Sequence, residues 1–151
     1  MAQRKKSILG ACVEDCIHVA GILGFLQIAE DFGYYTHFMG PAVPVDQLIE
    51  QIKQSEAHMI ALSYRLTPDT GYSIITDFIT RIKEEGLTER SYILGCLPEL
   101  AKKVGKMEFF DHIYTGGETV DDLLPLLRNE STSKLDDSFY PNDLVSRIEF
   151  K

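Results

Sequence analysis

The sequence predicts an α/β protein of the flavodoxin-like class, with five parallel strands in one sheet and helices on both faces. Short apolar runs alternate along the chain with longer amphipathic stretches, which indicates strands that alternate with helices. Such alternation favours a parallel sheet, because each parallel connection needs a crossover element. The length of 151 residues suits one domain with a hydrophobic core of its own.

The strands are expected where the apolar runs lie, and the helices where apolar residues recur every three or four positions. The predicted strands are 7–13, 34–39, 59–63, 92–95 and 109–114. The predicted helices are 19–32, 45–54, 72–85, 98–104 and 118–127. In the second helix the apolar residues are Val45, Leu48, Ile49 and Ile52. Pro125 is expected to bend or shorten the last helix.

The predicted domain covers residues 1–128. From 129 to 151 the composition turns polar, which is typical of a tail or linker. The mildly apolar stretch 144–150 would fit the start of a further domain that this chain lacks.

Charge and composition exclude several classes of function. The net charge of −8 disfavours nucleic acid and anionic membranes as partners. No apolar run reaches the roughly 18 residues of a membrane helix. The basic start is followed by Glu14 and Asp15 and does not resemble a signal peptide. Three cysteines give no disulfide framework, so we expect a reducing, cytoplasmic location.

Ligands of parallel sheets bind beyond the carboxyl ends of the strands, so the residues that follow each strand are the candidates. The first predicted strand is followed by Cys16 and His18, and then by Gly21 at a helix start. Neutral imidazole is a strong ligand for transition metals, which makes His18 a candidate metal ligand. From this loop alone, a surface or helix-capping histidine is the commoner outcome.

Three later loops carry candidates, each with an ordinary alternative. Thr67 and Asp69 follow the third strand, where either residue is suited to cap the next helix. Gly95 lets a ligand approach the backbone closely, or simply forms a turn. Gly116 and Gly117 open a helix and would cradle a phosphate, but this fragment is too common to be specific.

Together these fragments resemble the signature of cobalamin-binding domains: Asp-x-His-x-x-Gly, about 41 residues, Ser-x-Leu, a little under about 30 residues, then Gly-Gly. Here Cys16-x-His18-x-x-Gly21 is followed by residues 22–62, which number 41, and then by Ser63. Residues 66–94 separate this serine loop from Gly95. Order and spacing together are far more specific than any fragment, and the resemblance covers roughly residues 6–128.

The resemblance implies a bound cobalamin, either adenosylcobalamin or methylcobalamin, whose nucleotide tail leaves the cobalt and threads into the domain. His18 would take the freed cobalt position, an arrangement called base-off/His-on. Gly21 would give the tail room, Ser63 would hydrogen-bond it, and Gly95 would let its benzimidazole approach the fourth strand. The expected cofactor-binding set is completed by Cys16, Thr67, Asp69, Gly116 and Gly117.

The chain departs from the family pattern at three positions. Cys16 replaces the aspartate that normally bonds the other ring nitrogen of the histidine, Arg65 replaces the leucine, and Cys96 replaces the second glycine. A cobalt-bound imidazole still has a ring N–H, and leaving it buried without a partner costs roughly 1–3 kcal/mol. We therefore predict Asp69 as its acceptor; the alternative is that Asp69 caps the helix expected near Thr70.

Other uses of these residues are less favoured. A zinc site of Cys12, Cys16 and His18 lacks a fourth ligand at zinc spacing. A Cys16 nucleophile activated by His18 is disfavoured because residues two apart rarely reach each other suitably. His37, His58 and His112 are expected to be structural, and no catalytic residue is predicted.

The resemblance therefore implies a cofactor-carrying module that is inactive alone. It would present cobalamin to a catalytic mutase or methyltransferase subunit, for which the family favours a TIM barrel. Only about six residues precede the first predicted strand, which favours the small subunit of a mutase or a domain cut from a longer chain. The alternative is an interaction or regulatory module of the same fold that no longer binds cobalamin.

Overall fold

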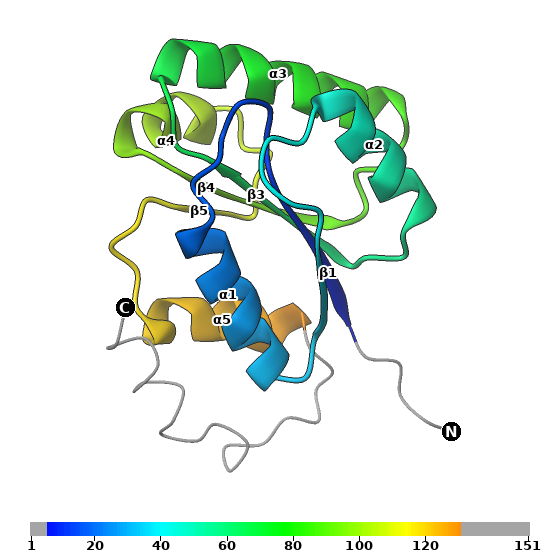
Figure 1. The fold of residues 1–151 in the computed structure, drawn as a ribbon, viewed down its shortest axis with the longest axis vertical. Helices are drawn as coiled ribbons and strands as arrows, with labels where there is room; N and C mark the ends of the chain where they lie inside the picture. Colours follow the sequence, from blue (N-terminus) through cyan, green and yellow to red (C-terminus); the bar gives the residue numbers. More distant parts are fainter. Residues whose placement is uncertain (1–5, 131–151) are drawn as a thin grey trace.

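The computed structural model of the chain describes residues 6–130, which form one five-stranded sheet between two layers of helices (Figure 1). In chain order the elements are β1 (Ser7–Cys12), α1 (Ala20–Asp31), β2 (Tyr35–Phe38), α2 (Val45–Gln54), β3 (Met59–Tyr64), α3 (Pro68–Glu84), β4 (Ser91–Cys96), α4 (Pro98–Gly105), β5 (His112–Tyr114) and α5 (Val120–Glu130). The strands pair in parallel in the order β2-β1-β3-β4-β5. This order is that of flavodoxin-like folds, so the predicted fold class is confirmed.

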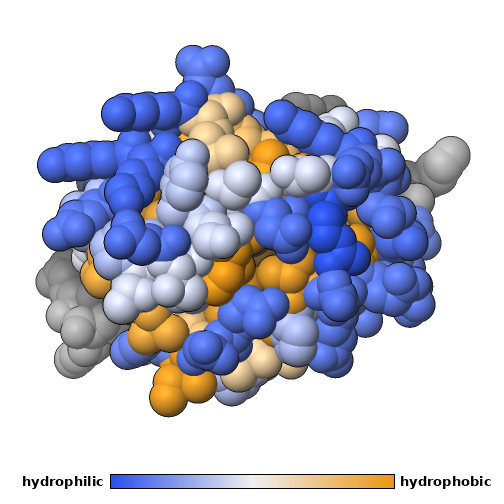
Figure 2. Space-filling model, turned by 90° about the horizontal axis from the view of Figure 1, so that it is seen from above, coloured by the Kyte–Doolittle hydropathy of each residue, from blue (hydrophilic) through white to orange (hydrophobic). Residues whose placement is uncertain are grey.

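The helices divide between the two faces of the sheet. Helices α1 and α5 lie on one face, and α2, α3 and α4 lie on the other (Figure 1). Helix α2 shows how the sequence achieves this, because its four buried residues are those of the predicted apolar stripe. Figure 2 shows the outer surface of the α2–α4 layer, where hydrophilic side chains predominate and hydrophobic surface is visible mainly between them.

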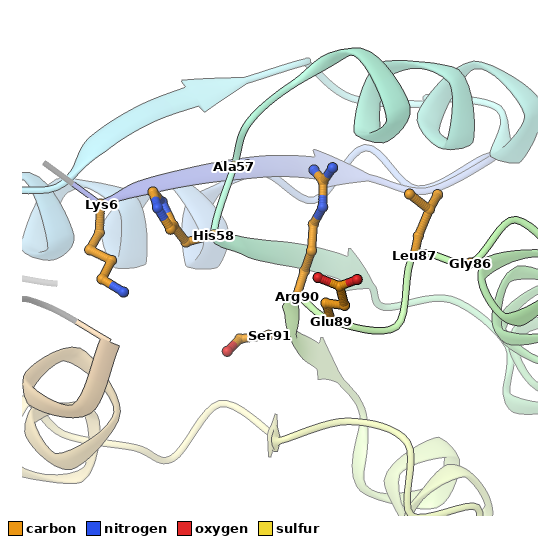
Figure 3. A pocket seen from close by; sticks show the side chains of 8 residues that line it. All are labelled: Lys6, Ala57, His58, Gly86, Leu87, Glu89, Arg90 and Ser91. Carbon is orange, nitrogen blue, oxygen red and sulfur yellow. The ribbon is translucent and has the colours of Figure 1, made fainter. Parts of the chain in front are cut away.

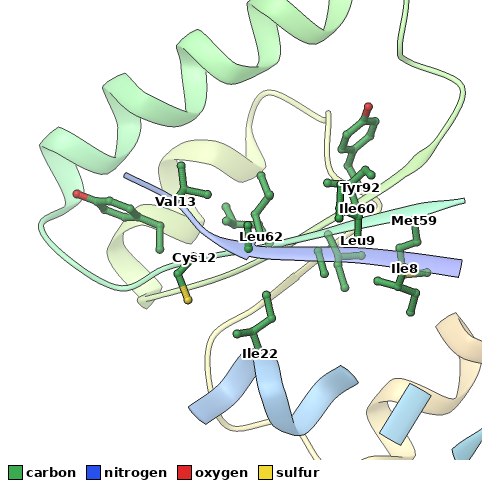
Figure 4. Packing of buried hydrophobic residues seen from close by; sticks show 14 of the residues in the cluster. Ile8, Leu9, Cys12, Val13, Ile22, Met59, Ile60, Leu62 and Tyr92 are labelled. Carbon is green, nitrogen blue, oxygen red and sulfur yellow. The ribbon is translucent and has the colours of Figure 1, made fainter. Parts of the chain in front are cut away.

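The side chain of Cys12 points to the α1 face of the sheet. A Cβ atom on Gly10 would meet Leu26 at 3.1 Å and Ile22 at 3.3 Å, both from α1. Alternate residues of a strand share a face, so Cys12 points the same way as Gly10 (Figure 4). The register of the sheet extends this face to residues of β3, β4 and β5.

Strand β5 is shorter than predicted. The predicted run began at Phe109, but the strand is only His112–Tyr114. The Phe109 ring packs against Tyr92, with ring centroids 5.0 Å apart, and the Tyr92 N–H donates to Asp111 Oδ2 at 2.8 Å. Aromatic packing therefore accounts for the hydrophobicity of this segment, and strand pairing begins only after Asp111.

Two helices differ from their predicted bounds by more than one residue. Helix α3 begins at Pro68 instead of residue 72, because proline is suited to the first turn of a helix and Thr67 before it is extended. Helix α5 begins at Val120 and continues to Glu130, so Pro125 lies inside it without ending it. The predicted tail from 129 onward lies outside the described residues, except for the last two residues of α5.

No helix in the described range 6–130 is long and apolar enough to cross a membrane.

Candidate functional site

A row of four residues crosses the sheet near the carboxyl ends of its strands. The pairing register places Cys12 beside Ser63, Ser63 beside Gly95, and Gly95 beside Tyr114. All four belong to the α1 face, because directly paired residues of parallel strands point to the same side. The structure thus brings together Ser63 and Gly95, which are 32 positions apart in the sequence and adjacent in the sheet.

Gly95 leaves open space in the middle of this row. A Cβ atom built there would have only two backbone oxygens within 4 Å, those of Leu62 and Tyr114, both at 3.9 Å. Ser63 beside it is only 4% exposed. The two residues therefore form a small, sheltered surface where a flat group has room to approach the strand.

His18 lies in the loop between β1 and α1, and its side chain is exposed. Its ring Nδ1 lies 3.9 Å from the sulfur of Cys16, which is fully buried. The Cys12 thiol donates to the backbone carbonyl of His18 over 3.5 Å. Cys16 thus contacts the imidazole of His18 and Cys12 contacts its backbone, and Nε2 is the ring nitrogen that the Cys16 sulfur does not contact.

The contact between Cys16 and His18 depends on a tight turn. Glu14 adopts a left-handed backbone conformation with φ of 54°, which is unusual for a residue other than glycine. Its N–H donates to Val43 at 2.7 Å, and its carboxylate accepts the N–H of Val45 at 2.7 Å. The Ala42 N–H donates to the Cys16 carbonyl at 2.9 Å. The turn is therefore held by the segment that leads into α2.

This geometry bears on the two alternative uses of these residues, a zinc site and a Cys16 nucleophile. Burial raises the pKa of Cys12 to about 11, so its thiol stays protonated at neutral pH. Within residues 6–130 no group of three or more His, Cys, Asp or Glu side chains is placed to hold a metal ion. Cys16 and His18 contact each other after the turn at Glu14, although residues two apart rarely reach each other suitably for a nucleophile and its base.

Asp69 lies elsewhere in the structure. Its side chain is 94% exposed and pairs with Lys103 of α4, with Nζ and Oδ1 2.7 Å apart. This lysine lowers the pKa of the Asp69 carboxyl. Asp69 is also not the N-cap of α3, since that position is Thr67, which is exposed and makes no side-chain capping bond. The structure therefore places Cys16, rather than Asp69, beside Nδ1 of His18.

The glycine pair after β5 does not form an open phosphate cradle. The N–H groups of Thr115 and Gly116 donate to the two carboxylate oxygens of Glu118, each at 2.8 Å. Arg65 reaches across from the β3–α3 loop and donates to the Thr115 carbonyl at 3.4 Å. A phosphate would have to displace a carboxylate here. Cβ atoms on Gly117 and on Gly21 would each have nothing within 4 Å.

Sequence reasoning missed Tyr114. Its hydroxyl oxygen is buried and has no hydrogen-bond partner among the described residues. Its ring stacks on that of His112, with centroids 5.8 Å apart and an interplanar angle of 5°. The feature that could have identified Tyr114 is its position at the end of a strand, at the same edge of the sheet as Ser63 and Gly95.

A cavity of about 370 Å³ lies at the other edge of the sheet, by the amino ends of β1, β3 and β4 (Figure 3). Its lining includes Lys6, His58 and Ser91. Parallel sheets bind their ligands at the carboxyl edge, and that edge holds His18, Ser63 and Gly95. We therefore assign the candidate site to the carboxyl edge and not to this cavity.

Comparison with known proteins adds independent information. No family model matches the chain. Dimethylamine corrinoid proteins 3 and 2 of Methanosarcina acetivorans are each 31% identical to it over 87 residues, which is 58% of this chain. A solved cobalamin-binding protein from Desulfitobacterium hafniense is 25% identical, with a TM-score of 0.67 over 82% of this chain and 58% of that one. The chain resembles cobalamin-binding domains in sequence and in fold.

The resemblance predicted from the spacing of His18, Ser63 and Gly95 is thereby confirmed. The chain spans about two fifths of the length of these curated relatives, 40% of one and 39% of the other. Two further matches show the fold alone. The methanol:cobalamin methyltransferase complex MtaBC of Methanosarcina barkeri has a TM-score of 0.68 at 13% identity, covering 93% of this chain and 54% of that one. A CheY-like receiver domain from Methylobacillus flagellatus has a TM-score of 0.53 at 13% identity, covering 85% and 100%.

Proposed function

We propose that this chain binds cobalamin base-off with His18 as the axial nitrogen ligand, and presents it to a methyltransferase. The observation that carries the proposal is the placement of His18 at the carboxyl edge, with the Cys16 sulfur against Nδ1 and not against Nε2. A histidine that binds a metal through one ring nitrogen almost always has a partner at the other. The names of the corrinoid-protein relatives support the choice of cofactor.

The described residues fit such a group at three points. The space over Gly95 would accept a flat aromatic base, since only backbone atoms lie within 4 Å of a Cβ there. Ser63 offers a hydroxyl beside it, and Tyr114 has a buried hydroxyl that lacks a partner within residues 6–130. The fit is incomplete at Gly116, where Glu118 already accepts the backbone N–H.

Each residue would have a limited task. His18 would hold the cobalt, and Cys16 would orient the imidazole through Nδ1. Ser63 would hydrogen-bond the nucleotide tail, and Gly95 would admit its base. When bound, the corrinoid supplies the methyl-transfer chemistry, and the protein supplies ligation and a sheltered site for the tail.

The expected partner is a catalytic subunit that carries the substrate. Dimethylamine corrinoid proteins among the relatives favour a methyltransferase over a mutase as this partner. A TIM-barrel partner and a cytoplasmic location belong to the same proposal.

Reconstitution tests the proposed function directly. The protein is mixed with hydroxocobalamin and desalted, and the absorbance spectrum of the protein fraction is recorded. We expect a red protein with stoichiometric corrinoid and a spectrum that differs from free hydroxocobalamin. A colourless protein fraction would instead support the alternative, a module of this fold that has lost its cofactor.

Removing the Cys16 thiol is expected to weaken the hold of His18 on cobalt. Cys16→Ala leaves Nδ1 without its sulfur contact, and loss of such a partner typically lowers metal affinity about 10–100-fold. Cys16→Ser keeps a hydrogen-bonding group and should retain much of the affinity. The measurement is the fraction of His-ligated cobalt in the Co(II) form, read from electron paramagnetic resonance spectra at fixed pH.

Cys96→Ala is the matched control for this experiment. Cys96 is also fully buried, but it pairs with Tyr64 on the opposite face of the sheet from Cys12. Its truncation leaves a comparable cavity without touching His18. If Cys96→Ala and Cys16→Ala reduce the His-ligated fraction equally, Cys16 has only a packing role.

A further inference from the structure

The Tyr114 hydroxyl is the one buried polar group of the candidate site that the fold leaves unused within residues 6–130. Its oxygen is buried without a hydrogen-bond partner there. Buried polar groups are nearly always hydrogen-bonded, because water is lost and must be replaced. The residue lies opposite Gly95, at the point where the sheet has open space. A ligand in that space would lie beside the Tyr114 side chain, which belongs to the same face of the sheet as the open position at Gly95.

Two other tyrosines in residues 6–130, both buried, have hydroxyl groups that are satisfied by the fold. The Tyr92 hydroxyl donates to the Leu87 carbonyl at 2.7 Å, and the Tyr34 hydroxyl donates to the Leu127 carbonyl at 2.6 Å. Each of these bonds ties a tyrosine to a neighbouring segment. Tyr114 differs from them in that its hydroxyl makes no such bond with the described residues.

The surroundings of Tyr114 determine what it can bind. Burial raises the pKa of Tyr114 to about 12, and Glu118 and Asp122 add to the rise, so the hydroxyl remains a donor at neutral pH. The same two carboxylates disfavour a negatively charged group beside the hydroxyl. The acceptor that suits this position is therefore uncharged, such as an oxygen or a ring nitrogen of a nucleoside.

We propose that Tyr114 recognises the nucleotide tail of the corrinoid, its hydroxyl donating a hydrogen bond to an uncharged acceptor of the nucleoside. This inference rests on the proposed function, because it takes cobalamin as the ligand. It adds a specificity: the chain distinguishes corrinoids with a complete tail from those without one. Neither the family pattern used for Ser63 and Gly95 nor the sequence around Tyr114 assigned it this role.

The test compares Tyr114→Phe with the wild-type protein against two ligands. Hydroxocobalamin carries the nucleotide tail, and aquacobinamide has the same corrin ring and cobalt without it. We expect the Kd for hydroxocobalamin to rise about tenfold, as for the loss of one hydrogen bond, and the Kd for aquacobinamide to stay unchanged. The unliganded variant should melt at the same temperature as the wild type or higher, because it loses only an unsatisfied group.

Tyr92→Phe is the matched control. Burial also raises the pKa of Tyr92 to about 12, but the Tyr92 hydroxyl is bonded to the Leu87 carbonyl. We expect a lower melting temperature and unchanged Kd values for both corrinoids. The inference is overturned if Tyr114→Phe leaves hydroxocobalamin binding unchanged, or weakens both ligands equally. A wild-type protein that binds neither corrinoid would remove the proposed function itself, and this inference with it.

Discussion

Replacing His18 with alanine is expected to abolish the nitrogen superhyperfine splitting in the electron paramagnetic resonance spectrum of the Co(II)-loaded protein. The splitting arises when a nitrogen binds cobalt axially, and the proposed site assigns that nitrogen to His18. Because the side chain is exposed, its truncation should change the free energy of unfolding by less than about 0.5 kcal/mol. The expected loss is therefore one of ligation and not of folding.

His37→Ala provides the control for this prediction. His37 is also exposed, but it lies on the edge strand β2 and is paired with Leu9, outside the row of Cys12, Ser63, Gly95 and Tyr114. Its removal should leave the nitrogen splitting intact. If the splitting persists in a folded His18→Ala protein loaded with cobinamide, which has no benzimidazole of its own, another nitrogen of the protein binds cobalt and the assignment of His18 is wrong.

A valine at position 95 is expected to block the nucleotide tail and to lower hydroxocobalamin affinity by about 100-fold or more, comparable to the loss of several good contacts. The protein should still fold, because a Cβ atom at Gly95 would come no closer than 3.9 Å to other atoms and valine favours strands. The isopropyl group would instead fill the space left for the base. Affinity is measured by absorbance titration, and folding by circular dichroism.

Gly95→Ala should reduce hydroxocobalamin affinity by a smaller amount than Gly95→Val. Its single methyl group occupies less of the space, so its affinity should lie between those of the wild type and Gly95→Val. Aquacobinamide, which has no tail to insert, should be affected much less by either substitution. Wild-type affinity for hydroxocobalamin in a folded Gly95→Val protein would show that the tail does not pass over Gly95.

The fold was largely predictable because its pattern is local. Helix α2 has the bounds expected from its apolar period, and each predicted strand has a counterpart in the sheet. The clearest error concerns Phe109 and Phe110, which were assigned to a strand on hydrophobicity. Phe110 packs edge-on against Phe109, with centroids 5.0 Å apart, in an aromatic cluster that no periodicity reveals.

The site was predictable only in part, for a different reason. Ser63 and Gly95 were expected to converge because parallel strands end at one edge of the sheet, and they are paired. Asp69 was predicted as the partner of His18 because the loop after the third strand was expected to reach the loop after the first. Asp69 instead forms a salt bridge with Lys103 of α4. That salt bridge follows from the packing of α3 on α4, which the sequence pattern does not reveal. The contact between Cys16 and His18 depends on the left-handed turn at Glu14, which the sequence pattern does not predict.

The turn that carries His18 is built from two stretches of chain. Val13 forms a bridge with Val43, the Cys12 N–H donates to the Gly40 carbonyl, and Glu14 caps the first turn of α2. A protein engineer who transplants residues 12–18 alone onto another flavodoxin-like scaffold would leave these bonds behind. The segment 40–45 has to travel with them, so the smallest portable unit of this loop is discontinuous in sequence.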